Sequence, residues 1–270
     1  MQFARSDGFN SIPSATGGIA RLACARLDKL GKDPTVILSK VGLTAEAARD
    51  PAVRLEVRTQ IKLLELAAEE VQDEWLGFHL ARSFDLREIG LVYYVIASSD
   101  QLADALRNAE RYSQINNEGV RLRFRMQDGS AVIALEYVNV DRDADRHQIE
   151  FWLMTLLRIC RQVTNGRLSP LQVKTKHSRN RVPAEIREFF GVDIKYGAMP
   201  TRSGFRDRLP CFLLWDATNI LTSCCGTTRK RRWRASPDSA SRFVQRQKTF
   251  CRNCCRTAEP RHRKLRAGSG

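Results

Sequence analysis

Regular hydrophobic patterning runs through this 270-residue chain to about residue 206 and then stops. Lys and Arg make up 14 of the last 50 residues, which contain two acidic residues, Asp238 and Glu259, so this stretch carries +12 of the formal net charge of +15. The first 220 residues hold 31 basic and 28 acidic side chains, a balance typical of a globular protein rather than of a nucleic-acid-binding surface. We therefore expect a flexible N-terminus at residues 1–16, one folded domain at 17–206, and a disordered, basic, cysteine-rich tail at 207–270.

The first half of the predicted domain has the spacing of short amphipathic helices. Apolar residues recur at helical intervals from Ile19 to Leu30, from Ile61 to Val71 and from Leu102 to Tyr112. The apolar run from Ile89 to Ala97 fits either a buried helix or a buried strand, because periodicity does not separate the two. This half is therefore expected to be helical.

The period changes from 3.6 to 2 after residue 119. Apolar residues alternate with arginines from Val120 to Met126, and the turn Gln127-Asp128-Gly129 leads into a second strand at Val132–Val138, which predicts a β-hairpin. A long helix with a broad apolar stripe follows from Asp145 to Val163, and a further strand lies near Leu171–Thr175. The fold class is α+β: a helical N-terminal half followed by a small sheet with interleaved helices.

Cysteine usage and hydropathy suggest a cytoplasmic protein. Cys24 and Cys160 lie within helix patterns and are expected to be buried free thiols, as in a reducing compartment. The first 18 residues lack the apolar core of a secretory signal, and no stretch approaches the length of a transmembrane helix. We expect no membrane association.

Several short motifs of this domain occur in an order and spacing that resemble a known family. The motifs are Asp50-Pro51-x-x-Arg54-Leu55, Leu76-Gly77-x-x-Leu80-Ala81, Ser98-Ser99-x-x-Leu102-x-x-Ala105-Leu106, Val173-x-Thr175-x-His177, Pro183, and Phe190-Gly191-Val192-x-Ile194-x-Tyr196-Gly197-Ala198. Over about residues 17–206 they resemble the N-terminal effector-binding and dimerisation domain, of arabinose-binding type, of AraC/XylS-type bacterial transcription regulators.

The resemblance implies a small-molecule effector, a homodimer, and a separate C-terminal module with two helix-turn-helix motifs that binds DNA. Residues 207–270 show no helical recurrence of apolar residues, so that module is not recognisable here. We therefore expect a truncated regulator that lacks its own DNA-binding module. An alternative is an inert or dominant-negative protein that heterodimerises with an intact regulator, and a third possibility is an enzyme of unrecognised type.

Three interpretations of the tail remain open. The cluster Arg229, Lys230, Arg231, Arg232 and Arg234, with Trp233 inside it, fits a non-specific nucleic-acid-binding arm or a solvated charge run. Cys251 and Cys254 have the spacing of a zinc knuckle, but the adjacent pairs Cys224-Cys225 and Cys254-Cys255 argue against a metal site. The composition of the tail also fits the translation of a GC-rich gene in the wrong reading frame. In this interpretation the reading frame shifted near codons 205–210.

An effector pocket is expected where the strands meet the long helix, with aromatic walls and a few polar groups. The candidate residues, chosen for their chemistry, are Tyr94, Tyr112, Arg121, His147 and Trp152. Core packing explains Tyr112 and Trp152 equally well, and the arginine face of the first strand also fits a solvated surface. The chain contains no motif of a catalytic or cofactor-binding site, so neither an enzyme nor a cofactor is expected.

Overall fold

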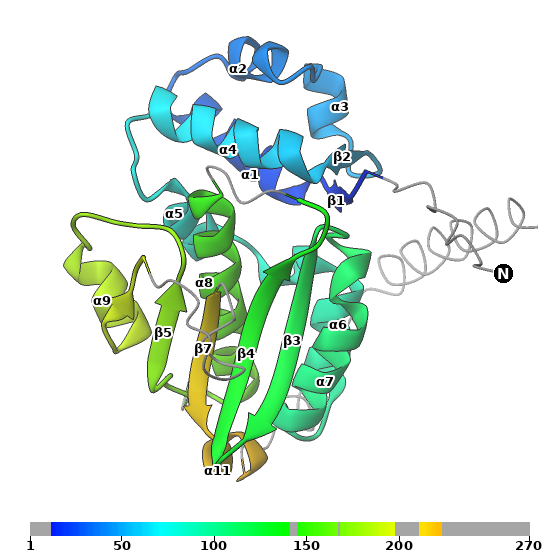
Figure 1. The fold of residues 1–270 in the computed structure, drawn as a ribbon. Helices are drawn as coiled ribbons and strands as arrows, with labels where there is room; N and C mark the ends of the chain where they lie inside the picture. The colour runs from blue at the N-terminus through cyan, green and yellow to red at the C-terminus, as the bar shows by residue number, and fades with distance from the viewer. Residues whose placement is uncertain (1–11, 141–144, 167, 198–210, 223–270) are drawn as a thin grey trace, which may run out of the picture. The chain divides into compact units, whose positions relative to one another are not determined.

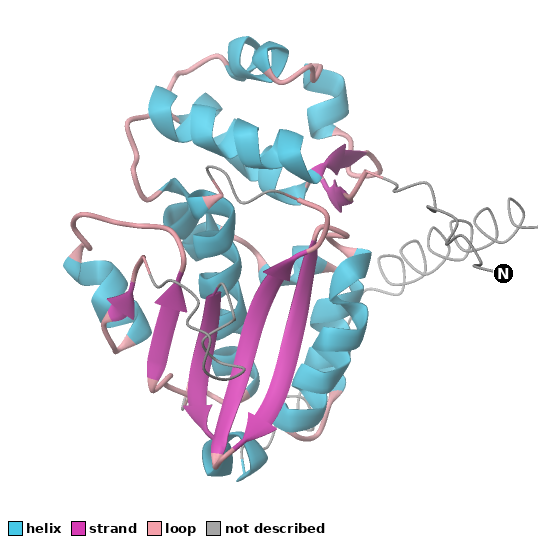
Figure 2. Ribbon diagram, in the orientation of Figure 1, coloured by secondary structure: helices cyan, strands magenta, loops and turns pink. Residues whose placement is uncertain are grey.

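The fold is described from a computed structural model, which describes residues 12–140, 145–166, 168–197 and 211–222 (Figure 1). Short helices occupy the first half, and a mixed sheet with interleaved helices follows (Figure 2). The predicted α+β class is confirmed.

The N-terminal part is a cluster of helices closed by a small two-stranded ribbon. Its elements are β1 (Ser14–Thr16), α1 (Gly18–Lys29), α2 (Pro34–Lys40), α3 (Ala45–Arg49), β2 (Arg54–Glu56) and α4 (Val57–Glu70). Strand β1 pairs antiparallel with β2, and the Thr16 amide donates to the carbonyl of Asn116 at 2.8 Å. The flexible N-terminus predicted at 1–16 is therefore too long, because Ser14–Thr16 already belong to the folded unit.

The second helical group connects this cluster to the sheet. It consists of α5 (Leu76–Ser83), the 3-10 turn η1 (Leu86–Ile89), α6 (Leu91–Ser98), α7 (Leu102–Tyr112) and the 3-10 turn η2 (Ser113–Ile115). The ambiguous run at 89–97 is helical, and Gly90, with a φ of 73°, redirects the chain between η1 and α6. A side chain rarely adopts that backbone conformation, which explains a glycine there.

The sheet has five strands in the order β3-β4-β7-β5-β6. Its strands are β3 (Val120–Gln127), β4 (Ser130–Tyr137), β5 (Gln172–Thr175), β6 (Ile194–Lys195) and β7 (Cys211–Asp216). The predicted hairpin is β3–β4, with Gln127 opposite Ser130. Asp128 and Gly129 both have positive φ, at 51° and 70°, as in the two-residue turn that suits the twist of a hairpin, so the loop is shorter than the expected three residues.

The C-terminal boundary predicted near residue 206 is too early. Strand β7 lies inside the sheet between β4 and β5, and Trp215 on it is fully buried. Helix α11 (Ala217–Thr222) follows, and its Ile220 is fully buried as well. Residues 211–222 therefore belong to the folded unit and not to a disordered tail. The prediction for 223–270 lies outside the described residues.

Helix α8 (Arg146–Val163) is the central helix of the domain, as the sequence predicted from its broad apolar stripe. It packs against the sheet together with α6 and α7 (Figure 1), and α9 (Ala184–Phe190) lies between β5 and β6 in the chain. Helix α5 approaches α8 so closely that a methyl group on Gly77 would lie 2.0 Å from the carbonyl oxygen of His147. That contact requires a glycine.

Candidate ligand-binding site

A cavity of about 60 Å³ lies between α8, the segment from η1 to α7, and the beginning of β3. The residues that line it, among those that the structure describes, are mostly apolar and include no charged side chain. The lining residues are Ile89, Val92, Ile96, Ala109, Ser113, Asn116, Asn117, Val120, Leu122, Leu135, Trp152, Thr155, Leu156 and Ile159. Apolar walls with a few placed polar groups are characteristic of small-molecule sites in proteins.

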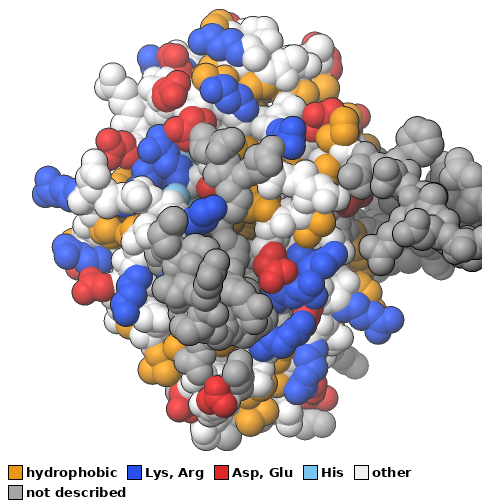
Figure 3. All heavy atoms as spheres, in the orientation of Figure 1, with side chains coloured by type: hydrophobic (Ala, Val, Ile, Leu, Met, Phe, Trp, Pro, Cys, Tyr) orange, Lys and Arg blue, Asp and Glu red, His pale blue; other side chains and the backbone are white. Residues whose placement is uncertain are grey.

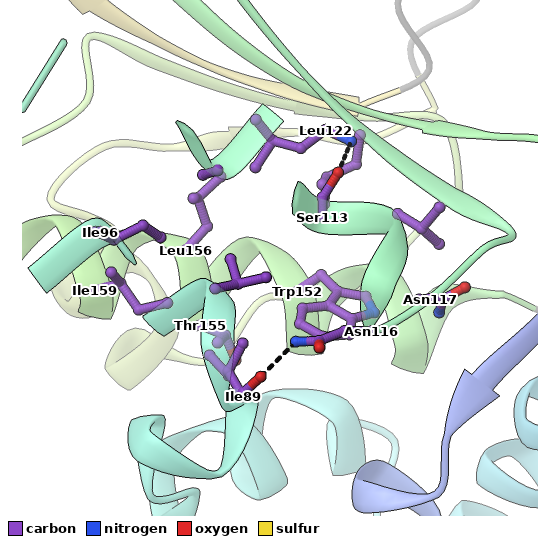
Figure 4. A pocket seen from close by; sticks show the side chains of 14 residues that line it. Ile89, Ile96, Ser113, Asn116, Asn117, Leu122, Trp152, Thr155, Leu156 and Ile159 are labelled. Carbon is purple, nitrogen blue, oxygen red and sulfur yellow. Dashed lines mark hydrogen bonds between the residues drawn. The ribbon is translucent and has the colours of Figure 1, made fainter. Parts of the chain in front are cut away.

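Helix α8 contributes one stripe to this wall. Trp152, Thr155, Leu156 and Ile159 follow one another at helical spacing, so they share a face. In Figure 4, Ile159 of this stripe lies beside Ile96 of α6, and Thr155 lies beside Ile89 of η1. The stripe is the one that predicted the helix, and Thr155 is a polar residue within it.

Two polar side chains of the wall are already used by the fold. The amide nitrogen of Asn116 donates to the carbonyl of Ile89 at 2.7 Å, which ties η1 to the chain entering β3 (Figure 4). The Ser113 hydroxyl accepts from the Leu122 amide at 3.3 Å and donates to the Glu110 carbonyl at 3.2 Å. These hydrogen bonds hold the wall in place, and they leave Asn116 Nδ2 and Ser113 Oγ less available to a ligand.

Three other polar atoms of the wall have no partner among the described residues: Asn117 Nδ2, Trp152 Nε1 and Thr155 Oγ1. Asn117 is 2% exposed and Thr155 is 1% exposed, so bulk water does not solvate them. A buried polar group without a hydrogen bond costs about 1–3 kcal/mol. Three such atoms around one cavity therefore indicate that something else completes their hydrogen bonds.

Among the five residues predicted for the effector site, Trp152 lines this cavity and the other four do not. Tyr94 is 37% exposed on α6, and Tyr112 is partly buried with the Arg111 guanidinium 5.5 Å from its ring centre. Arg121 lies on β3, partly exposed. The structure therefore does not bring the five predicted side chains together around this cavity.

The arginine face of β3 belongs to the surface. In Figure 3, Lys and Arg side chains gather over β3 with acidic side chains among them. Arg123 pairs with Glu136 at 3.0 Å, and Arg125 pairs with Glu110 at 3.0 Å. These pairs fit the solvated-surface interpretation better than an anion-binding pocket.

His147 lies in the first turn of α8 and is 1% exposed. Its Nδ1 accepts from the Gly77 amide at 3.4 Å, and its Nε2 lies 3.6 Å from a Glu65 carboxylate oxygen. Desolvation by burial lowers the pKa of His147 to about 4, so the imidazole is neutral at neutral pH. Its role is in the packing of α5 against α8, away from the cavity wall.

A buried ionic cluster occupies another side of α8. Glu150 accepts from Arg179 through two hydrogen bonds, of 2.8 and 2.7 Å, and lies 3.0 Å from His177 Nε2. The Arg179 guanidinium lies 4.3 Å from the ring centre of Trp75. Burial acts to raise the pKa of Glu150, but the hydrogen bonds from His177 and Arg179 hold it below its usual range. This cluster ties α8 to the chain that follows β5.

The remaining sequence predictions concern metals, membranes and nucleic acid. In the part of the chain that the structure describes, no group of His, Cys, Asp or Glu is arranged to hold a metal ion, and no helix is long and apolar enough to cross a bilayer. The basic cluster Arg229, Lys230, Arg231, Arg232 and Arg234, and the cysteine pairs after Ser223, lie outside the described residues.

Residues 31–209 match the family model described as the arabinose-binding domain of AraC transcription regulator, N-terminal. The chain therefore belongs to the AraC-type transcription regulators, and this part is their N-terminal effector-binding domain, which is not an enzyme.

Among solved structures, the chain is similar to the crystal structure of transcriptional regulator CdpR from Pseudomonas aeruginosa. The match has 11% sequence identity and a TM-score of 0.47, and it covers 71% of this chain. It covers 56% of the CdpR chain, so this chain spans little more than half of that regulator. No curated protein sequence matches the chain.

Proposed function

We propose that the domain senses a small-molecule effector in the cavity beside α8, and that the bound effector biases how two copies of the domain pair. The observation that carries the proposal is a set of three buried polar atoms in one apolar wall that have no partner in the part of the chain that the structure describes: Asn117 Nδ2, Trp152 Nε1 and Thr155 Oγ1. Domains of this family bind effectors and mediate dimerisation, which supports the second half of the proposal.

The size of the cavity supports a sensing role. About 60 Å³ has room for only a few water molecules, whereas ligand pockets commonly reach several hundred Å³. An effector of more than a few atoms therefore has to move part of the wall. A ligand that binds the widened state better than the closed state shifts the population toward it, and the displaced helices transmit the change.

The site is tested by ligand screening with a cavity-filled variant. We expect hits to raise the melting temperature of the full chain, because a ligand that binds the native state stabilises it. Ala109 lines the cavity, and Ala109→Leu places extra carbon atoms in it, so the same hits should lose their effect. Hits that stabilise this variant as much as the wild type would assign binding to another place. Analytical ultracentrifugation with and without a hit tests whether the effector changes dimerisation.

We also propose that DNA recognition is not encoded by residues 223–270 in this reading frame, because they are basic but lack the apolar period of helix-turn-helix motifs. The packed elements β7 and α11 continue through Thr222, which supports placing a change of frame beyond that codon rather than at 205–210. Translation of the other two frames downstream tests this. A helix-turn-helix pattern in one of them supports a frameshift, and its absence from both overturns it.

A further inference from the structure

The cavity wall described above carries no charge, and this restricts its ligand. Among the described residues around it, none is Asp, Glu, Lys, Arg or His. An ionised carboxylate, phosphate or ammonium group would lose its hydration on entry and meet no counter-charge, which is costly in a buried site. The wall therefore favours an uncharged ligand.

The unpartnered atoms of the wall restrict the ligand further, because they mainly donate hydrogen bonds. Trp152 Nε1 and Asn117 Nδ2 are donors only, and the Thr155 hydroxyl either donates or accepts. The neighbouring oxygen of Asn117 is already occupied by the Gly119 amide at 3.0 Å. The ligand that completes this wall offers acceptor oxygens rather than further donors.

A sugar fits this wall poorly despite the name of the family. A pentose carries a hydroxyl donor on nearly every carbon, and each buried hydroxyl without an acceptor costs about 1–3 kcal/mol. The apolar side chains of Ile96, Leu156 and Ile159 offer no such acceptor. They suit a hydrocarbon frame instead.

We infer that the effector is a small, uncharged molecule with one or two acceptor oxygens on an apolar frame, of the ketone, lactone or ester class, and not a sugar or an organic anion. Its acceptor oxygens accept hydrogen bonds from the unpartnered groups of Trp152, Thr155 and Asn117, and its hydrocarbon part lies against Ile96 of α6 and against Leu156 and Ile159 of α8. This inference rests on the proposed function, because it assigns the chemistry of the same site.

The test uses the full chain and four simple probes at millimolar concentration. Acetone and cyclopentanone are neutral carbonyl compounds of two sizes, acetate is an anion as small as acetone, and L-arabinose is a polyol. Binding is followed at the indole N–H signals of the four tryptophans in ¹⁵N-labelled protein, with Trp152→Phe identifying the Trp152 signal. Trp215 serves as a matched reference, because its Nε1 is also buried and unpartnered but does not line the cavity.

We expect the two carbonyl probes to shift the Trp152 signal and leave the Trp215 signal in place, and we expect acetate and L-arabinose to shift neither. Thr155→Val keeps the shape of the side chain and removes one hydrogen bond, so it should weaken cyclopentanone binding about fivefold. This isosteric variant also keeps the test valid if Ala109→Leu does not fold.

The outcomes separate the class of ligand from the location of the site. If L-arabinose or acetate shifts the Trp152 signal and Ala109→Leu abolishes the shift, the ligand class is wrong while the cavity remains the binding site. If the carbonyl probes bind Ala109→Leu and Thr155→Val as tightly as the wild type, the site itself is wrong. If no probe shifts the Trp152 signal, the inferred class is overturned.

Discussion

Helix α8 carries two buried polar regions that differ in how their polar atoms are completed. On one side, Glu150 is bonded to both Arg179 and His177, and every oxygen of its carboxylate has a donor. On another side, Trp152 Nε1 and Thr155 Oγ1 face a cavity and have no partner among the described residues. The two regions lie within two turns of the same helix.

The difference in hydrogen bonding distinguishes a structural contact, the Glu150 cluster, from a potential binding site, the cavity. A satisfied buried ion pair holds two segments in one arrangement, and breaking it leaves an uncompensated charge. Unsatisfied donors around a cavity lower the stability of the empty protein and regain that energy when a ligand supplies acceptors. We therefore interpret the ionic cluster as the anchor of α8 and the cavity as the part that responds.

The largest expected effect comes from breaking the anchor. Glu150→Gln leaves the Arg179 guanidinium buried, at 5% side-chain exposure, without a charged partner, so we expect a loss of about 3–5 kcal/mol in the free energy of unfolding. Urea denaturation measures it. The control is Arg125→Gln, which breaks the more exposed pair with Glu110 and should cost less than about 1 kcal/mol. Equal losses in the two variants would remove the distinction between anchor and surface pair.

A second test concerns His147, a third buried polar group on α8. Its pKa of about 4 lies below the 6.5 of an unfolded chain, so the unfolded state binds a proton first as the pH falls. The stability that the neutral imidazole contributes is complete above about pH 6.5 and declines toward pH 4, by about 3 kcal/mol in total.

The control for this test is His147→Asn, which cannot titrate in the window. Other groups change too: the hydrogen bond that His79 donates to the Asp73 carboxylate raises the pKa of His79, which opposes the trend, and Glu150 has a lowered pKa. The difference between wild type and variant in urea denaturation from pH 7 to pH 4 isolates His147. A difference that stays constant over this range would contradict a neutral buried imidazole.

The smallest expected effect comes from the cavity itself. Thr155→Val removes a hydroxyl without a partner, so the empty protein should gain about 1 kcal/mol of stability, while a matched substitution at a bonded threonine should lose stability. Thr164→Val is that match, because the Thr164 hydroxyl donates to the Cys160 carbonyl at 2.7 Å. If both variants are destabilised alike, the Thr155 hydroxyl has a partner in the native protein.

Much of the secondary structure could be predicted from local patterns. The hairpin followed from strict alternation in Val120–Met126 and from the turn residues that lead into the second strand, and α8 followed from its broad apolar stripe. Strand β7 was missed because its first five residues are apolar on both faces and lie close to the basic tail. A central strand has no polar alternation, so only its partners β4 and β5 identify it.

The candidate site divides in the same way. Trp152 was predicted because a large aromatic residue on the stripe of a long helix is either core or pocket wall, and the structure places it in the wall. Asn117 and Thr155 were not predicted, although a threonine within an apolar stripe is a usable signal. Their importance depends on whether they find hydrogen-bond partners in the folded domain. The side chains that could serve as partners lie on η1, η2 and β3, which are far from α8 in the chain, so the sequence does not show which atoms stay unpaired.

By itself the sequence determined the order of helices and strands, the family resemblance and the long helix at the centre, because these depend on contacts and spacings within short segments. Tertiary structure alone decided that β7 completes the sheet, that the Glu150 carboxylate is ion-paired while the Thr155 hydroxyl has no partner among the described residues, and that an uncharged cavity lies between α8 and α6. Those properties depend on which distant side chains meet in the folded domain, and burial then sets whether a polar atom is satisfied or left for a ligand.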